Sequence, residues 1–212
     1  MSDTQTAASM RINSMLDANS FVEIGGMVTA RATDFNLSAK AAPNDGVITG
    51  YGTVEGSLVY VYSQDVSVLG GTIGEMHAKK IVNLYTLARR TGAPVIGILD
   101  SNGVRLEEST DALIALGQIY RTMVLASGVI PQITAVFGSC GGGLSFIPAL
   151  SDFAFMTDSA KLFVNVPDAV IGESVDTLSN QSAEYQAESN NVAVIGTEEE
   201  VYAKVRQLIS LL

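Results

Sequence analysis

Apolar and polar residues follow two different periods along the chain, and the period changes near residue 74. Apolar and β-branched runs at residues 47–54 and 58–64 predict two strands joined by a hairpin turn at residues 55–57. Beyond Gly74 the apolar residues recur at i, i+3, i+4 and i+7, as on one face of a helix that ends at Gly92. The apolar residues of that face are Ile81, Leu84, Tyr85 and Ala88.

Strands and helices then alternate. Strands are expected at residues 95–99, 132–137 and 153–156, a helix at residues 110–126 and a short helix directly after Gly141. This alternation predicts an α/β fold in which right-handed crossovers cover a sheet. The polar segment at residues 174–191 is interpreted as a loop or a frayed helix.

The two ends of the chain differ in how clearly they predict structure. At the C-terminal end, Thr197 and Glu200 have the spacing of a capping box, which opens a helix burying Val201, Val205, Leu208 and Ile209. Residues 1–45 are predicted to be a helical lead-in followed by a loop, and residues 46–212 to be a single main domain, which a length of 212 residues suits.

Composition and charge exclude several classes of function. The sequence has no run of about eighteen apolar residues and a polar N-terminus, so we expect neither membrane insertion nor a signal peptide, and a cytoplasmic location. A formal net charge of −10 disfavours nucleic-acid binding, which needs a basic face. A single cysteine, Cys140, excludes an internal disulfide, and with the single histidine, His77, it predicts no metal site.

Three glycine-rich turns are the candidate sites of chemistry. They lie at residues 68–75, 100–105 and 137–143, where backbone N–H groups can approach a ligand without side chains in the way. The third follows a strand and opens a helix, so the N–H groups of Gly142 and Gly143 suit an oxyanion. An alternative interpretation is that these glycines only permit close packing of helix and strand. None of the three matches a Walker A loop.

Cys140 lies in Gly138-Ser-Cys-Gly-Gly142, which has the form of a nucleophile elbow with cysteine in place of serine. That elbow needs a later histidine, whereas His77 comes earlier in the chain. We therefore interpret Cys140 as a structural residue. His77 could orient a ligand from the start of its helix, but a buried packing residue is the favoured interpretation.

Together with their flanks, the three turns resemble the carboxyltransferase subunits of biotin-dependent acyl-CoA carboxylases and decarboxylases. The resemblance covers residues 8–172, and it implies a crotonase-like fold, a spiral of ββα units. The segments that carry it are residues 21–25, 46–52, 62–65, 69–80, 126–132, 138–143 and 148–153, with Phe163 and Pro167-Asp168 after them.

The resemblance also implies a mechanism, in which the thioester carbonyl becomes an enolate held by backbone N–H groups while a carboxyl group moves between biotin and the α-carbon. The oxyanion donors map to Gly142 and Gly143. The remaining substrate-binding positions that the resemblance implies are Gly70, Gly71, Gly103, Val104, Arg105 and Gly141.

Some positions depart from the family pattern. Asn102 stands where a glycine is usual, Val104 replaces an alanine, and residues 165–166 are Asn-Val in place of Thr-Gly. The glycine pair and histidine expected after Glu173 are absent from residues 177–191. The sequence of residues 100–105 is more similar to that of malonate decarboxylase subunits, which act without biotin.

The resemblance further implies partners. A second crotonase-like half or subunit would supply the biotin pocket, a biotin carboxyl carrier protein would present biotin, and acyl-CoA would be the substrate of a homo- or hetero-oligomer. Two alternatives stay open. One is a self-sufficient crotonase-type enzyme with an acid or base among Glu107, Glu108 and Asp111. The other is a non-catalytic scaffold.

Overall fold

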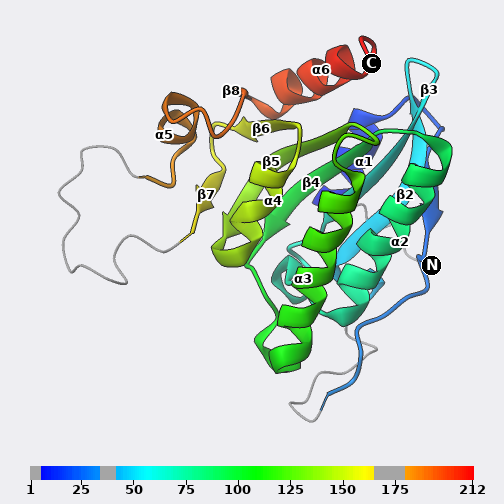
Figure 1. Cartoon of the computed structure of the whole chain (residues 1–212), viewed down its shortest axis with the longest axis vertical. Coiled ribbons are helices and arrows are strands. Elements are labelled where there is room, and N and C mark those ends of the chain that lie inside the picture. Colours follow the sequence, from blue (N-terminus) through cyan, green and yellow to red (C-terminus); the bar gives the residue numbers. More distant parts are fainter. Residues whose placement is uncertain (1–5, 34–41, 165–179) are drawn as a thin grey trace.

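The computed structural model describes residues 6–33, 42–164 and 180–212. Within them one eight-stranded sheet has the strand order β1-β2-β3-β4-β5-β6-β8, and β7 pairs with the far end of β5 (Figure 1). Strands β1 to β3 are antiparallel and the later pairs are parallel. The strands are β1 (Val22–Ile24), β2 (Val47–Val54), β3 (Ser57–Gln64), β4 (Val95–Ser101), β5 (Gln132–Gly141), β6 (Phe153–Thr157), β7 (Lys161–Phe163) and β8 (Val194–Gly196).

Helices cover both faces of the sheet. On one face α2 and α3 lie side by side, and on the other face α1 and α6 are in contact (Figure 1). Each face has its own apolar cluster, so the domain consists of three layers. The helices are α1 (Ala7–Met15), α2 (Glu75–Thr91), α3 (Ser109–Ala126), α4 (Phe146–Leu150), α5 (Ala183–Glu188) and α6 (Glu198–Ile209).

Most of the predicted elements are present. The hairpin between β2 and β3 turns at Glu55 and Gly56, both with positive φ. Helix α2 ends at Gly92, whose φ of 73° is left-handed. Helix α6 begins with the predicted capping box, because Thr197 and Glu200 exchange hydrogen bonds. Its residues Val201, Val205 and Ile209 are buried, and Leu208 is partly buried.

One predicted boundary was wrong. Strand β5 does not end at Phe137 but continues through Gly141, because residues 139–141 pair with β7. The segment predicted as a loop or frayed helix contains, in its described part (residues 180–191), the six-residue helix α5 with turns on both sides, which agrees with the helical alternative. Residues 174–179 of that prediction lie outside the described residues.

The N-terminal lead-in packs against the same body as the rest of the chain. Strand β1 pairs with β2 at the sheet edge, and α1 buries Ala8, Ile12 and Met15 in the cluster that also holds α6. A domain boundary at residue 45 stays a prediction. Residues 34–41 lie outside the described residues, and residues 44–46 form a 3₁₀ turn.

Among the described residues, no helix is both long enough and apolar enough to cross a membrane. The same residues bring no three His, Cys, Asp or Glu side chains together as a metal site would need.

Candidate functional site

The three glycine-rich turns lie next to one another at the C-terminal ends of β4 and β5. Ser101 of β4 is in register with Cys140 of β5. The N–H of Asn102 donates to the carbonyl oxygen of Gly70 at 3.0 Å, and the N–H of Ile73 donates to that of Gly103 at 2.9 Å. The C-terminal end of parallel strands is where open α/β sheets bind ligands.

Close packing explains some of these glycines. A Cβ on Gly71 would lie 2.6 Å from the carbonyl oxygen of Asp100, and one on Gly138 would overlap the Asp100 carboxylate. A Cβ on Gly70 would lie 2.7 Å from the amide nitrogen of the Asn102 side chain. The packing interpretation therefore accounts for Gly71 and Gly138.

Gly142 is different, because nothing lies within 4 Å of the position that its Cβ would take. Its φ of 63° turns the chain at the end of β5. Gly142 and Gly143 are the first two residues of the Gly142–Ser145 turn, so the turn itself gives their N–H groups no acceptor. Gly141, directly before them, pairs with Phe163 of β7. The N–H groups of Gly142 and Gly143 are the candidate donors to an oxygen atom of a ligand.

Tyr120 of α3 fixes the far side of this turn. Its hydroxyl donates to the carbonyl oxygen of Gly143, and burial raises the pKa of Tyr120. A Cβ on Gly143 would lie 2.8 Å from Leu116. Helix α3 therefore holds the peptide after Gly143 in one orientation.

The helix after the turn is short, as predicted. Gly142–Ser145 is a 3₁₀ turn, and α4 adds only Phe146–Leu150. Since the partial charge at a helix end comes from aligned peptide dipoles, this short helix contributes little to it. What this turn can offer to an anion is therefore the individual N–H groups at its start.

The other predicted site residues divide by exposure. Gly70, Val104 and Gly141 are partly exposed, whereas Gly71, Gly103 and Arg105 are buried. The N–H of Gly103 donates to Ser101 Oγ at 3.1 Å, and Arg105 is bound to internal acceptors. Ligand contact by these residues stays a prediction. The structure gives the three buried ones a place in the supporting framework.

Neither Cys140 nor His77 is available for chemistry. Burial raises the pKa of the Cys140 thiol to about 12. Burial, aided by the charge of Arg105, lowers the pKa of His77 to about 3. His77 Nδ1 lies 2.9 Å from the carbonyl oxygen of Asp45, so it carries the proton, and Nε2 accepts from Gln64 at 3.3 Å. Both residues are structural, as interpreted from the sequence.

The three acidic candidates for a crotonase-type enzyme lie on the rim of α3. Glu108 is buried in an ion pair with Arg105, and Asp111 forms one with Arg31 at 2.6 Å. Glu107 is exposed. A general acid or base among the first two would have to break its ion pair.

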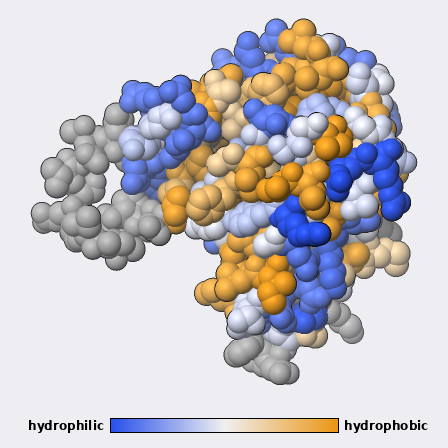
Figure 2. All heavy atoms as spheres, in the orientation of Figure 1, coloured by the Kyte–Doolittle hydropathy of each residue, from blue (hydrophilic) through white to orange (hydrophobic). Residues whose placement is uncertain are grey.

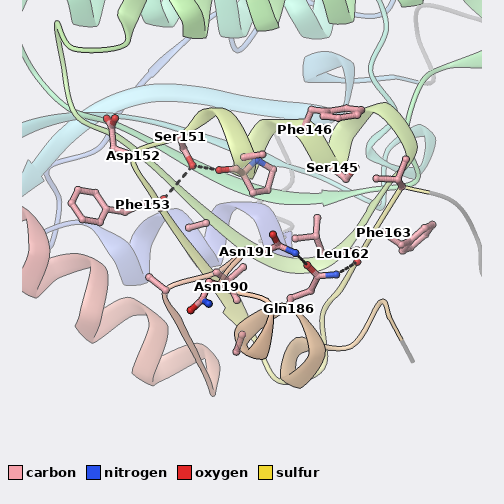
Figure 3. Close-up of a pocket in the computed structure, with 17 residues that line it drawn as sticks. Ser145, Phe146, Ser151, Asp152, Phe153, Leu162, Phe163, Gln186, Asn190 and Asn191 are labelled. Carbon is pink, nitrogen blue, oxygen red and sulfur yellow. Dashed lines mark hydrogen bonds between the residues drawn. The ribbon is translucent and has the colours of Figure 1, made fainter. Parts of the chain in front are cut away.

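A cavity of about 670 Å³ begins beside the Gly142–Ser145 turn (Figure 3). It lies between α4, β7 and α5, and Phe146 and Phe163 line it with polar residues that include Asn190 and Asn191. Gln186 is held by Asn191 at 2.7 Å and itself donates to the Leu162 carbonyl at 3.0 Å. No Lys or Arg lines the cavity, so its described walls suit an apolar group better than a phosphate.

Sequence comparison assigns the whole chain to a family. The family described as "Carboxyl transferase domain" matches residues 2–212. The chain belongs to this family. It is 42% identical over 208 residues to the propionyl-CoA carboxylase beta chain of Roseobacter denitrificans, and 41% identical to methylmalonyl-CoA decarboxylase subunit alpha of Veillonella parvula. Each match covers 95% of this chain and 41% of the relative, so this chain spans about two fifths of their length.

Solved structures confirm the crotonase-like α/β fold. Transcarboxylase 12S, with methylmalonyl-coenzyme A and methylmalonic acid bound, superposes with a TM-score of 0.93 and 37% identity, over 98% of this chain and 42% of that one. A Pseudomonas malonate decarboxylase hetero-tetramer chain superposes with a TM-score of 0.86 over 96% of this chain and 82% of that one. At 23% identity, that second likeness concerns the fold alone.

Sequence reasoning missed the residues that support the site from outside the turns. Asp45 stands in an Asn-Asp-Gly sequence that is typical of an exposed turn, yet it is buried against Arg105. Tyr120 carries only the helical periodicity of α3. No local signal marks either residue, since both acquire their role from segments far away in the chain.

Proposed function

We propose that this chain is the acyl-CoA-binding half of a carboxyltransferase. The N–H groups of Gly142 and Gly143 hold the thioester oxygen as the α-carbon gains or loses a carboxyl group and negative charge moves onto that oxygen. Biotin on a partner chain would supply the carboxyl group and take up the α-proton on its ureido nitrogen, or would accept the carboxyl group and return that proton. Because the donors are backbone groups already fixed in place, they stabilise the enolate without reorganising.

The observation that carries this proposal is the glycine turn that ends β5, whose first two N–H groups have no acceptor within the turn. That turn lies beside the Gly103 turn, which itself contacts the Gly70 turn, in a chain of the carboxyl transferase family. The relatives' names support the substrate class, since they include a propionyl-CoA carboxylase and a methylmalonyl-CoA decarboxylase. The absence of an available histidine or thiolate at the turn fits a site that relies on backbone groups.

The proposal includes a second, C-terminal half and a biotin carboxyl carrier protein as partners. Exposed apolar side chains on α3 and α4 support a partner surface next to the site, on the face that Figure 2 shows. They are Leu113, Ile114, Val124, Leu125 and Phe146. Transcarboxylase 12S is a hexamer and the malonate decarboxylase a hetero-tetramer, which supports an oligomer here. We place the assembly in the cytoplasm, where a free thiol such as Cys140 stays reduced.

Reconstitution tests this function. The chain alone should transfer no carboxyl group from a biotin carrier to propionyl-CoA, and adding the matching C-terminal half should start the transfer. The measurement is incorporation of a labelled carboxyl group. Turnover by the chain alone, at a rate that the second half does not raise, would contradict the proposal.

Two substitutions at one position test the donor itself. Gly142→Pro removes the N–H and cannot adopt a φ of 63°, so the reconstituted rate should fall by about a hundredfold or more. Gly142→Ala is the matched control, since it keeps the N–H and its Cβ meets open space. The alanine variant adds only the backbone strain of a left-handed residue, about 1–2 kcal/mol. Its reconstituted rate should stay within about tenfold of that of the natural chain. Equal losses of rate in both variants would show that the N–H of Gly142 does not contribute to the reaction.

A further inference from the structure

Below the glycine turns lies a buried cluster of charges that the proposed function does not use. The side chain of Arg105 is 1% exposed. Its guanidinium donates to the Asp45 carboxylate and to Glu108 Oε1, the latter at 2.9 Å. It also donates to the carbonyl oxygen of Thr72 at 2.6 Å and to the Thr72 hydroxyl at 3.2 Å. One planar group therefore serves four acceptors from three segments of the chain.

Both carboxylates use their second oxygen to hold the start of α2. Asp45 Oδ2 accepts the N–H of His77 at 2.7 Å, and Glu108 Oε2 accepts that of Glu75 at 2.7 Å. These donors lie in the first turn of α2, where N–H groups have no acceptor within the helix. Asp45 and Glu108 carry two negative charges, and Arg105 balances only one of them. The positive end of α2 offsets the other.

This cluster is joined directly to the site. The N–H of Arg105 donates to the carbonyl oxygen of Ile73 at 2.9 Å, and the N–H of Ile73 donates to that of Gly103 at 2.9 Å. On its other side Gly103 faces the third turn, since a Cβ placed on it would lie 3.8 Å from the carbonyl oxygen of Gly141. The place where Arg105 is anchored therefore sets how far the turn at Gly103 stands from the turn at Gly142.

We propose that Arg105 is a positioning residue, whose ion pairs with Asp45 and Glu108 fix the spacing between the Gly103–Val104 turn and the Gly142–Gly143 donors. The ligand-binding part of this role rests on the proposed function. The guanidinium itself does not touch the ligand. Arginine is required because its planar fork of donors reaches all four acceptors, whereas lysine has its donors on one nitrogen atom.

Amide NMR spectra of the 212-residue chain test the spacing without any ligand. In Arg105→Lys, the amide signals of Gly103, Gly142 and Gly143 should shift or broaden, while those of α6 stay in place. The matched control is Arg31→Gln, which removes a cation from the exposed ion pairs with Glu75 and Asp111 on the same rim. It should leave the three glycine signals unchanged.

Glu108→Gln provides a second test in case Arg105→Lys does not fold. Glutamine has nearly the same shape as glutamate, and the change leaves Arg105 paired with Asp45. It should move the same three signals by a smaller amount. If either variant is folded and the glycine signals are unmoved, the proposal is overturned; if the lysine variant is unfolded, Glu108→Gln decides.

A titration with propionyl-CoA separates this proposal from the proposed function. For folded Arg105→Lys the dissociation constant should rise at least about tenfold relative to Arg31→Gln, because misplaced contacts lose much of their effect. If the glycine amide signals shift but the dissociation constant for propionyl-CoA stays unchanged, the positioning role is contradicted. If the natural chain and its reconstituted assembly bind no thioester, the proposed function fails, and the glycine signals alone decide the role of Arg105.

Discussion

At the residue scale, the last residues of β5 and the turn that follows bring a thiol and two candidate backbone donors within four positions. Cys140 of β5 belongs to the apolar cluster that also contains Tyr62 and Leu144. The proposed ligand contacts are instead the N–H groups of Gly142 and Gly143. The buried side chain and the backbone of this segment therefore have separate roles.

Cys140→Ala should leave thioester binding and reconstituted activity within a few fold of the natural chain. The thiol stays protonated at neutral pH, since burial raises its pKa to about 12. The substitution removes only a small buried group and should cost about 1–2 kcal/mol of stability. Denaturant unfolding and activity of the same preparation measure both effects. A loss of about a hundredfold in activity, with the fold intact, would show that the thiol takes part.

His77 should make stability depend on pH. Its folded pKa of about 3 lies below the ordinary value of 6.5, so between these values the unfolded chain binds a proton that the folded chain does not. Stability from this group is therefore complete above about pH 6.5 and is lost as pH falls, by about 1.4 kcal/mol per pH unit.

His77→Asn tests this, because asparagine does not titrate and can still donate toward the Asp45 carbonyl. Its free energy of unfolding, measured by urea denaturation from pH 7 to pH 4, should fall less steeply with pH than that of the natural chain. The difference between the two slopes should correspond to one bound proton, or about 1.4 kcal/mol per pH unit. Parallel slopes in the two proteins would contradict the assignment of a neutral, buried imidazole.

At the element scale, local signals predicted helices and turns well and failed where a distant segment decides. The capping box of α6 and the glycine that ends α2 are complete within a few residues. The extension of β5 through Gly141 depends on pairing with β7, about twenty residues later, and no pattern within residues 138–141 indicates it. The burial of Arg105 likewise depends on Asp45, sixty residues away.

The cap of α6 gives a prediction at this scale. Thr197→Ala removes the hydroxyl that accepts the N–H of Glu200 at 3.3 Å, and should cost about 1 kcal/mol of stability. For a chain of this size that corresponds to a melting temperature lower by about 2–4 °C. Thr197→Ser keeps the hydroxyl and serves as the control. If alanine and serine melt together, the cap contributes nothing measurable to the fold.

At the scale of the whole molecule, apolar side chains on α3 and α4 are exposed beside the site. The chain covers about two fifths of the length of the relatives that it matches. The formal net charge of −10 also means that the phosphates of a coenzyme A thioester gain no general attraction to this chain. We therefore expect the backbone contacts at the glycine turns, and contacts from a partner, to carry binding.

Following the backbone amide signals of Gly142 and Gly143 during a titration with propionyl-CoA tests the central claim most directly. Both signals should move and saturate together with the bound fraction, in the chain alone or in its assembly with the C-terminal half. Saturable binding that leaves both signals in place, or no binding by either folded form at millimolar thioester, would contradict it.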